Sequence, residues 1–320
     1  MKISIILPVF NEAQSVPELF SGLSEILATL PHEYEIIAVN DGSKDASLSE
    51  LQKLAKKDKC IKILDFLINA GQTSALRAGI DHATGDVFIP MDSDLENDPR
   101  DIVLLLEKID EGFDVVSGWR KNRWEGSFFT RKLPSKIANF LISYITGVHL
   151  HDYGCTLKAY RSEVLRDVKL YGEMHRFIPA YASWRGATVT EVVVNHRPRK
   201  FGKSNYGIGR SFKVLLDLLL IRFLFQFMNR PIHFFGSIGF ISLALGGLAG
   251  LVAVFLRLVY DMSMITTPLP TLSALLIIVG VQFIGMGILA EMLMRIYYES
   301  QAKTPHTIRE KINFSEVTKE

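Results

Sequence analysis

Cysteine is scarce in this chain of 320 residues, which contains only Cys60 and Cys155. The two residues lie far apart in the sequence and have no spacing typical of metal ligands. We therefore expect both to be free thiols, which is typical of proteins in a reducing compartment.

We also expect no signal peptide, and the chain has no strong excess of one charge. Its first ten residues contain one lysine and a strand-like apolar run that is too short for a signal sequence. We therefore expect the N-terminal half to stay in the cytoplasm. The net charge of +2 argues neither for nor against binding to nucleic acid, and we predict no nucleic-acid partner. Internal repeats and low-complexity segments are absent from the sequence.

Apolar residues, in contrast, are abundant in the C-terminal third. Residues 232–260 and 271–298 each hold an apolar run near the roughly 20 residues that cross a bilayer. We predict two membrane-spanning helices within residues 230–300. Arginine and lysine flank the two runs, whereas the connector 261–270 has neither. This asymmetry predicts an inner-membrane or plasma-membrane protein with both termini and the N-terminal domain in the cytoplasm.

A segment of mixed character, residues 208–229, connects the N-terminal domain to the first predicted span. It combines phenylalanine and leucine at helical spacing with arginine, lysine and aspartate, a pattern typical of a helix in the membrane interface. A core helix of the N-terminal domain is the alternative interpretation. We expect the polar tail 301–320 to be poorly ordered. Glycines recur in both spans and permit close helix packing, so we expect a homo-oligomer.

The first half of the chain alternates β-type runs with amphipathic helical runs. We predict strands over residues 3–9, 34–40, 61–66 and 86–91, and helices over residues 15–30, 46–57 and 73–83. This order predicts an α/β fold of the Rossmann type, with a parallel sheet and helical crossovers. Ligands bind such sheets at the carboxyl ends of the strands. The loops expected at that edge are 8–12, 40–43, 69–72 and 92–96.

An acidic run follows the fourth predicted strand. In the sequence VFIPMDSDLENDP, an apolar strand leads into a turn that carries Asp92, Asp94 and Glu96. Carboxylates this close repel one another unless a proton or a metal ion screens them, and oxygen ligands favour Mg²⁺ or Mn²⁺, which also bridge phosphates. A solvated acidic turn is the alternative. Together with Asp41 and a set of downstream cations, the run indicates a nucleotide-diphosphate site.

Motifs along almost the whole chain resemble the family 2 glycosyltransferases, and within them the polyprenyl-phosphate enzymes related to dolichol-phosphate mannose synthase and bacterial bactoprenol glucosyltransferase. The eight motifs are ILPVFNE at 6–12, VNDGSKD at 39–45, NAGQTSALRAGI at 69–80, MDSDLENDP at 91–99, SGWR at 117–120, RKLPSKIAN at 131–139, DYGCTLKAYR at 152–161 and RKFGKSNY at 199–206. The resemblance implies a GT-A catalytic domain over residues 1–207. It also implies a metal-dependent, inverting transfer of a hexose to polyprenyl (undecaprenyl) phosphate.

The resemblance also implies the residues of the site. The nucleotide sugar would be bound by Pro8, Phe10, Glu12, Asp41, Asn69, Arg77, Asp92 and Ser93. The metal, Mg²⁺ or Mn²⁺, would be bound by Asp92, Asp94 and Glu96, the last standing where the mannose synthases often have glutamine. The acceptor phosphate and leaving diphosphate would be surrounded by Arg120, Arg131, Ser135, Arg199 and Lys203. Catalytic roles would fall to Asp94, Arg131 and Asp152, of which Asp152 either assists the attack or orients the sugar. A helix cap or a buried ion-pair partner is the structural alternative for Asp152.

The donor sugar and two rival functions remain open at this stage. The two predicted spans and the overall similarity favour UDP-glucose, while GDP-mannose, UDP-GlcNAc and a modified arabinose are alternatives. A processive polysaccharide synthase would carry a Gln-x-x-Arg-Trp element and more spans, neither of which this sequence has. A non-catalytic membrane binding protein would not need Asp92, Asp94, Arg131 and Asp152 together.

Overall fold

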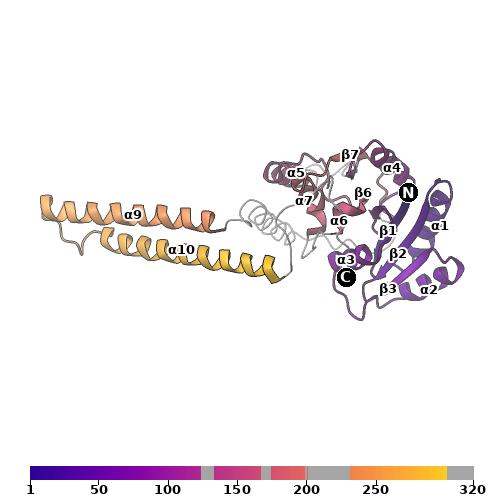
Figure 1. The fold of residues 1–320 in the computed structure, drawn as a ribbon, viewed down its shortest axis with the longest axis horizontal. Helices are drawn as coiled ribbons and strands as arrows, with labels where there is room; N and C mark the ends of the chain where they lie inside the picture. The colour runs from indigo at the N-terminus through magenta and orange to yellow at the C-terminus, as the bar shows by residue number, and fades with distance from the viewer. Residues whose placement is uncertain (124–132, 167–173, 199, 201–230, 301–320) are drawn as a thin grey trace, which may run out of the picture. The chain divides into compact units, whose positions relative to one another are not determined.

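The structure is a computed structural model that describes residues 1–123, 133–166, 174–198, 200 and 231–300 (Figure 1). The chain divides into two compact units, Met1–Leu219 and Leu220–Glu320. The predicted interface helix over 208–229 and the tail over 301–320 lie outside the described residues. The domain boundaries at residues 207, 229 and 300 stay predictions.

The first half of the N-terminal unit is a parallel β/α arrangement. Its strands are β1 (Lys2–Val9), β2 (Glu33–Asn40), β3 (Ile61–Asp65) and β4 (Val87–Pro90), and its crossover helices are α1 (Val16–Leu27), α2 (Ser47–Lys57) and α3 (Gln72–His82). β1 pairs in parallel with β2 and β4, and β2 pairs in parallel with β3. These elements confirm the predicted ones, with boundaries that differ by at most three residues.

The second half adds an antiparallel strand that the sequence analysis did not include. β6 (Lys158–Arg161) runs antiparallel between β4 and β5 (Val115–Trp119), and β7 (Val189–Val193) pairs in parallel with β5. The described sheet has seven strands in the order β3-β2-β1-β4-β6-β5-β7. Because β6 runs against its neighbour β4, its first residue, Lys158, lies at the edge where β4 ends.

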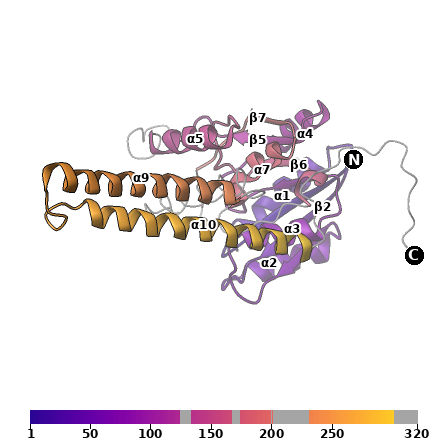
Figure 2. The ribbon, with the colours of Figure 1, turned by 60° about the vertical axis from the view of Figure 1, so that its left-hand side comes forward.

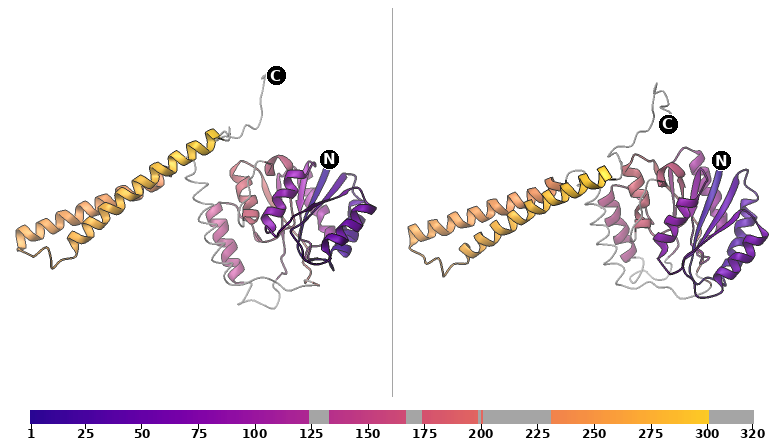
Figure 3. Two further views of the ribbon diagram at one scale, coloured as in Figure 1. Left: turned by 90° about the horizontal axis from the view of Figure 1, so that it is seen from below. Right: turned by 60° about the horizontal axis from the view of Figure 1, so that its bottom comes forward.

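Helices cover both faces of the sheet, which Figure 3 shows between its helical layers. The remaining elements are η1 (Pro99–Asp101), α4 (Ile102–Asp110), α5 (Leu133–Thr146), α6 (Ser162–Leu165), η3 (Met174–Phe177) and α7 (Ile178–Trp184). β1 is buried on both sides: Ile5 and Leu7 belong to a core with residues of α1 and α4, while Ile6 belongs to a core with residues of α3 and α7. A strand that is apolar on both faces is typical of a parallel sheet enclosed by helices.

The C-terminal unit is a pair of long apolar helices, α9 (Pro231–Tyr260) and α10 (Leu269–Ser300), which lie side by side (Figure 2). Both are long and apolar enough to cross a membrane, so the two predicted hydrophobic segments are confirmed as helices. Glycine allows the helices to approach closely: a Cβ added at Gly239 would lie 2.8 Å from the carbonyl oxygen of Gly280. The hydroxyl of Ser273 also donates to the carbonyl oxygen of Gly246 at 2.7 Å.

Candidate active site

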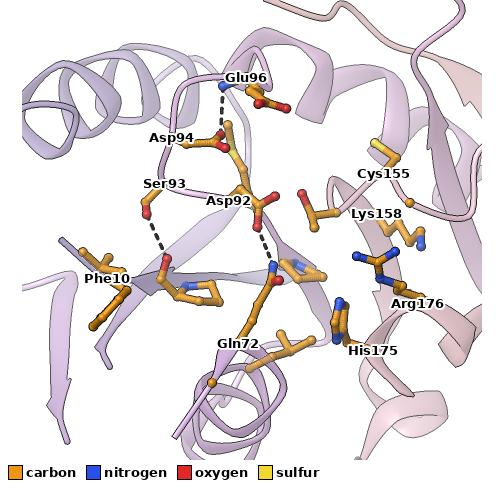
Figure 4. Close-up of a pocket in the computed structure, with 18 of the residues that line it drawn as sticks. Phe10, Gln72, Asp92, Ser93, Asp94, Glu96, Cys155, Lys158, His175 and Arg176 are labelled. Carbon is orange, nitrogen blue, oxygen red and sulfur yellow. Dashed lines mark hydrogen bonds between the residues drawn. The ribbon is translucent and has the colours of Figure 1, made fainter. Parts of the chain in front are cut away.

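A cavity of about 400 Å³ opens at the carboxyl ends of the central strands. This is the edge at which the sequence analysis placed the ligand crevice, and the volume lies in the range of small-molecule sites. Its lining comes from the loops after β1, β2 and β4, from the start of α3, from the segment before and within β6, and from η3 (Figure 4). The predicted nucleotide-sugar residues Pro8, Phe10, Glu12, Asp41, Asn69, Asp92 and Ser93 all line it.

Asp41, after β2, holds the neighbouring loop in place. Its carboxylate accepts hydrogen bonds from the backbone N–H groups of Ala70 at 2.6 Å and Gly71 at 2.9 Å, and from Asn69 Nδ2 at 2.9 Å. Gly42 makes the close approach possible, because it adopts φ +63° and a Cβ there would lie 2.5 Å from the backbone nitrogen of Asn69. Asp41 therefore shapes this end of the cavity through the loop that it binds.

An aromatic ring stands at the same end of the cavity. Phe10, just after β1, leaves 42% of its surface exposed although it is a large apolar residue. Next to it, the hydroxyl of Ser93 donates to the carbonyl oxygen of Pro8 at 2.9 Å (Figure 4). This bond ties the end of β1 to the loop after β4 and so fixes the position of the acidic run relative to the strand that precedes Phe10.

The acidic run leaves β4 as predicted and enters the cavity. Gln72 Nε2 donates to Asp92 Oδ1 at 2.7 Å, and the backbone N–H of Glu96 donates to Asp94 Oδ1 at 3.0 Å. Leu95, which lies between Asp94 and Glu96, adopts a φ of +64°, a strained backbone conformation for a residue other than glycine. Burial and the adjacent charge of Asp94 raise the pKa of the Asp92 carboxyl above its usual range.

The donor chemistry of the run fits a divalent cation that also contacts a phosphate. Within the described residues, no three His, Cys, Asp or Glu side chains come close enough to enclose a metal ion. Glu96 instead lies 3.9 Å from Arg120 Nη1. Mg²⁺ usually takes one or two carboxylates and completes its shell with water and substrate phosphates. Asp92 and Asp94, two mutually repelling carboxylates at a cavity, match that mode of binding.

Arg120 and Asp152 form a buried ion pair beside the cavity. Arg120 Nε donates to Asp152 Oδ2 at 2.8 Å, and Nη2 donates to Oδ1 at 3.2 Å. Burial alone would raise the pKa of the Asp152 carboxyl, but the charge and hydrogen bonds of Arg120 outweigh it and hold the pKa below its usual value. Arg120 lines the cavity, whereas Asp152 is not among the described residues that do. The structure therefore shows that Asp152 is a buried ion-pair partner, while its role in the attack or in orienting the sugar stays a prediction.

The basic side of the cavity includes residues that the sequence analysis missed. Lys158 in β6 is 2% exposed, and its Nζ donates to the carbonyl oxygen of Tyr153 at 3.1 Å. From η3, His175 places Nδ1 2.7 Å from Thr73 Oγ1, and Arg176 lies beside Lys158 (Figure 4). Lys158 belongs to the motif DYGCTLKAYR at 152–161. The motif could therefore have identified Lys158 as a site residue, but the sequence analysis selected only Asp152 from it.

Other predicted site residues lie elsewhere or outside the described part of the chain. Arg77 is absent from the described lining of the cavity and pairs with Asp81 one turn later on α3. Ser135 lies in the first turn of α5 and is likewise absent from that lining. Arg131, Arg199 and Lys203 are outside the described residues. Of the predicted acceptor-phosphate set, the structure thus brings only Arg120 to the described cavity wall.

Comparisons with known proteins agree on one family. Residues 4–169 match the model described as Glycosyl transferase family 2. The chain is 42% identical over 317 residues to a dodecaprenyl-phosphate galacturonate synthase from Rhizobium johnstonii, and the match covers 97% of this chain and 93% of that protein. It is 37% identical over 310 residues to an undecaprenyl-phosphate 4-deoxy-4-formamido-L-arabinose transferase from Klebsiella pneumoniae, covering 96% and 93%.

Solved structures show the same fold at much lower identity. Glucosyl-3-phosphoglycerate synthase from Mycobacterium tuberculosis, crystallised with Mn²⁺ and UDP-glucose, superposes with a TM-score of 0.56 at 16% identity. The similarity covers 69% of this chain and 78% of that one. It confirms the predicted GT-A-like α/β domain.

Proposed function

The chain belongs to glycosyltransferase family 2, and from that premise we propose that it transfers a sugar from a nucleotide-sugar donor to the phosphate of a polyprenyl lipid. The observation that carries the proposal is the match over 97% of the chain to an enzyme named for dodecaprenyl phosphate. That match covers 317 residues and so extends through the two apolar helices, which could hold the enzyme at the membrane where a lipid acceptor lies. A lipid acceptor keeps its hydrocarbon chain in the bilayer and its phosphate at the surface.

The donor nucleoside lies at the Phe10 end of the cavity. The exposed ring offers a stacking face to the base, an interaction worth about 1–3 kcal/mol where it has been measured for nucleic-acid bases. The loop 69–71, held by Asp41, supplies polar groups beside it. Glu12 completes this end as an acceptor for ribose or base donors.

Asp92 and Asp94 bind a divalent cation together with the donor diphosphate. Mg²⁺ or Mn²⁺, when bound, would neutralise the charge that develops on the leaving diphosphate. Gln72 orients Asp92 through its hydrogen bond, and the backbone N–H of Glu96 orients Asp94. Glu96 adds a negative charge beside this pair. Both Mg²⁺ and Mn²⁺ are candidates for the bound metal.

The chemical step needs positioning more than proton transfer. A phosphate oxygen of the lipid attacks the anomeric carbon of the sugar, and the bond from that carbon to the diphosphate oxygen breaks. The lipid phosphate is already anionic near neutral pH, so no strong general base is required. A single in-line displacement inverts the anomeric configuration. Asp152 contributes by fixing the Arg120 guanidinium at the cavity wall, where it stabilises phosphate charge.

The acceptor side includes three predicted cations that lie outside the described residues, namely Arg131, Arg199 and Lys203. With the interface helix predicted at 208–229, they would meet the lipid phosphate at the membrane surface. The charge asymmetry around the two helices supports catalysis at the cytoplasmic face. The glycines that bring α9 and α10 together also support assembly into a homo-oligomer.

Galacturonate is the first candidate for the transferred sugar, because the enzyme named for it is 42% identical over almost the whole chain. The glucose that the sequence analysis predicted is the second candidate. 4-Deoxy-4-formamido-L-arabinose follows from the relatives at 36–37% identity. We take the donor nucleoside to be uridine in each case.

Release of nucleoside diphosphate tests the proposal directly. Purified full-length protein in detergent is supplied with Mg²⁺ or Mn²⁺ and a panel of UDP-sugars, with and without undecaprenyl phosphate. We expect UDP release only when the lipid phosphate is present. Release that is independent of the lipid would indicate a hydrolase or a transferase to another acceptor, and no release from any donor would indicate a binding protein.

A further inference from the structure

Lys158, His175 and Arg176 form a basic cluster in the cavity wall, and the family comparison assigns it no ligand. Lys158 comes from β6, and the other two residues come from η3. All three line the cavity. Lys158 and His175 are buried in the protein, with 2% and 8% of their surfaces exposed. The cluster is therefore built into the wall and is not a solvated basic surface.

No direct ion pair joins the ammonium group of Lys158 to a carboxylate within the described part of the chain. The ammonium donates one hydrogen bond, to the carbonyl oxygen of Tyr153 at 3.1 Å, and an ammonium has three donors. The charge of Asp152 favours the ammonium from a distance, but the hydrogen bonds of the Asp152 carboxylate in this wall are to Arg120 and Gly154. Burial of an ammonium without an anion is unfavourable, so this position favours a ligand that brings one.

The pKa of Lys158 is consistent with a buried ammonium group that makes no direct ion pair. Burial lowers the pKa of Lys158 to about 8. The charge of Asp152 opposes this decrease, and the cations Arg120 and Arg176 add to it. The group therefore remains mostly protonated at neutral pH. A bound anion would offset both the burial and the repulsion between neighbouring cations.

The cluster lies across the cavity from Phe10. In Figure 4, Asp92 stands between Phe10 on one side and Lys158, His175 and Arg176 on the other. The antiparallel register of β6, with Tyr160 opposite Phe88, places Lys158 next to the end of β4. A donor with its base at Phe10 and its diphosphate at Asp92 and Asp94 would direct its sugar toward the basic cluster.

We propose that Lys158 and Arg176 bind a carboxylate on the donor sugar, so that the enzyme selects a nucleoside-diphosphate uronic acid. The inference rests on the proposed function, because it places a nucleotide sugar in this cavity. In a uronic acid, a carboxylate replaces the hydroxymethyl group at C6 of the hexose. The carboxylate can accept from both cations, whereas a hydroxymethyl group leaves the buried ammonium uncompensated. Sites that are built around a buried polar contact reject substrates that lack it by large factors.

The acceptor phosphate is another anion that could reach these cations, so the test separates the two. Full-length protein is assayed with undecaprenyl phosphate and either UDP-galacturonate or UDP-galactose, which differ only at C6. We expect kcat/KM to be higher for UDP-galacturonate by about 100-fold or more. Equal use of the two donors, or a preference for UDP-galactose, overturns the inference and leaves the proposed function intact. Transfer from no UDP-sugar defeats the proposed function itself.

Variants then assign the selectivity to residues. Lys158→Met should lower the ratio of kcat/KM for UDP-galacturonate to that for UDP-galactose by about tenfold or more. Lys158→Arg, which keeps the charge, should restore at least part of the preference. Lys53→Met, at an exposed lysine of α2 paired with Glu50, is the matched control and should behave as wild type.

The acceptor arm of the experiment measures KM for undecaprenyl phosphate in the same variants. We expect it to be unchanged by Lys158→Met. A rise in that KM, with equal losses for both donors, would show that the cluster binds the acceptor phosphate and would overturn the assignment. If Lys158→Met does not fold, Arg176→Gln provides the second variant, with the same predicted shift in donor preference.

Discussion

The Arg120 guanidinium binds the Asp152 carboxylate through two hydrogen bonds of 2.8 and 3.2 Å, and both residues are buried. The contact joins the end of β5 to the segment that leads into β6. It keeps Asp152 ionised and gives Arg120 a fixed position at the cavity wall.

Replacement of Asp152 by Asn should destabilise the protein and abolish transfer. The amide removes the charge that compensates a buried guanidinium, and breaking a buried ion pair from one side costs about 3–5 kcal/mol in the free energy of unfolding. Thermal unfolding of the full-length protein in detergent measures the loss. Asp81→Asn is the matched control, because it breaks the exposed Arg77–Asp81 pair and should cost no more than about 0.5 kcal/mol. Equal effects of the two substitutions would contradict the buried pair.

The pH profile provides a second test of Asp152. Because its pKa is lowered in the folded protein, the contribution of the ion pair to stability is complete above the usual pKa of the carboxyl group. It is lost only as the pH falls below that value toward the folded pKa. We therefore expect no decrease in activity or in melting temperature from Asp152 between pH 6 and 8. A fall in the melting temperature of the wild type across that range that is absent from Asp152→Asn would show that Asp152 titrates near neutral pH and would contradict this account.

Replacement of Gly42 by Ala should weaken binding of the donor. A Cβ at this position collides with the backbone of Asn69 and displaces the loop that Asp41 holds. We expect KM for the nucleotide sugar to rise by about tenfold or more, since small misplacements in a binding site have large effects. Gly147→Ala is the control, because Gly147 has a similar φ of +74° but open space around its Cβ position. Both variants carry the same backbone strain of about 1–2 kcal/mol, so only Gly42→Ala should change KM.

Glu35 lies near the start of β2, at the opposite edge of the sheet from the cavity. Its lowered pKa makes the free energy of unfolding depend on pH. Burial alone would raise the pKa of its carboxyl group, but hydrogen bonds from Lys62, Ser4 and Thr84 lower it from 4.5 to about 2. Its contribution, about 3 kcal/mol on this shift, is therefore complete above pH 4.5 and is lost as the pH falls toward 2. We expect Glu35→Gln to unfold at a lower temperature than wild type at pH 7, with the difference shrinking below pH 4.5. A difference that stays constant down to pH 3 would contradict this account.

Replacement of Gly239 by Val should destabilise the pair of apolar helices. A Cβ at Gly239 would lie 2.7 Å from the side chain of Ile284 as well as close to the backbone of α10. Gly247→Val introduces the same β-branched side chain into α9 at a position with no atom within 4 Å. The melting temperature of the detergent-solubilised protein should fall for Gly239→Val and stay near wild type for Gly247→Val. Equal melting temperatures would show that α9 and α10 do not pack through these glycines.

The parallel half of the sheet could be predicted from the sequence because its signals are local. The apolar runs that became β1 to β4 are bounded by turns and separated by amphipathic helices, and each pattern is complete within a short window. The acidic loop after β4 was predictable for the same reason. Its composition revealed the chemistry, and its place after a strand located it at the ligand edge.

The basic wall of the cavity could not be predicted in this way. β6 has only four residues, and which end of it faces the cavity depends on its antiparallel pairing with β4, a contact between distant segments. Arg77 shows that a local motif can also select a residue whose side chain lies outside the described lining of the cavity. It was assigned to the nucleotide from its motif, although the buried face of α3 is formed by Ala75, Leu76, Gly79 and Ile80, and Arg77 pairs along the helix with Asp81.

Transfer of radiolabelled sugar into lipid is the measurement that tests the central claim most directly. Full-length protein is incubated with undecaprenyl phosphate and labelled UDP-galacturonate or UDP-glucose, with Mg²⁺ or Mn²⁺ or with a chelator. Asp94→Asn and, as a matched control, Asp110→Asn at the exposed end of α4 are assayed in parallel. The account predicts labelled lipid only with metal, its loss by at least about 100-fold in Asp94→Asn, and wild-type labelling in Asp110→Asn. Labelling that survives the chelator and the Asp94→Asn substitution, or no labelled lipid from any donor, would contradict it.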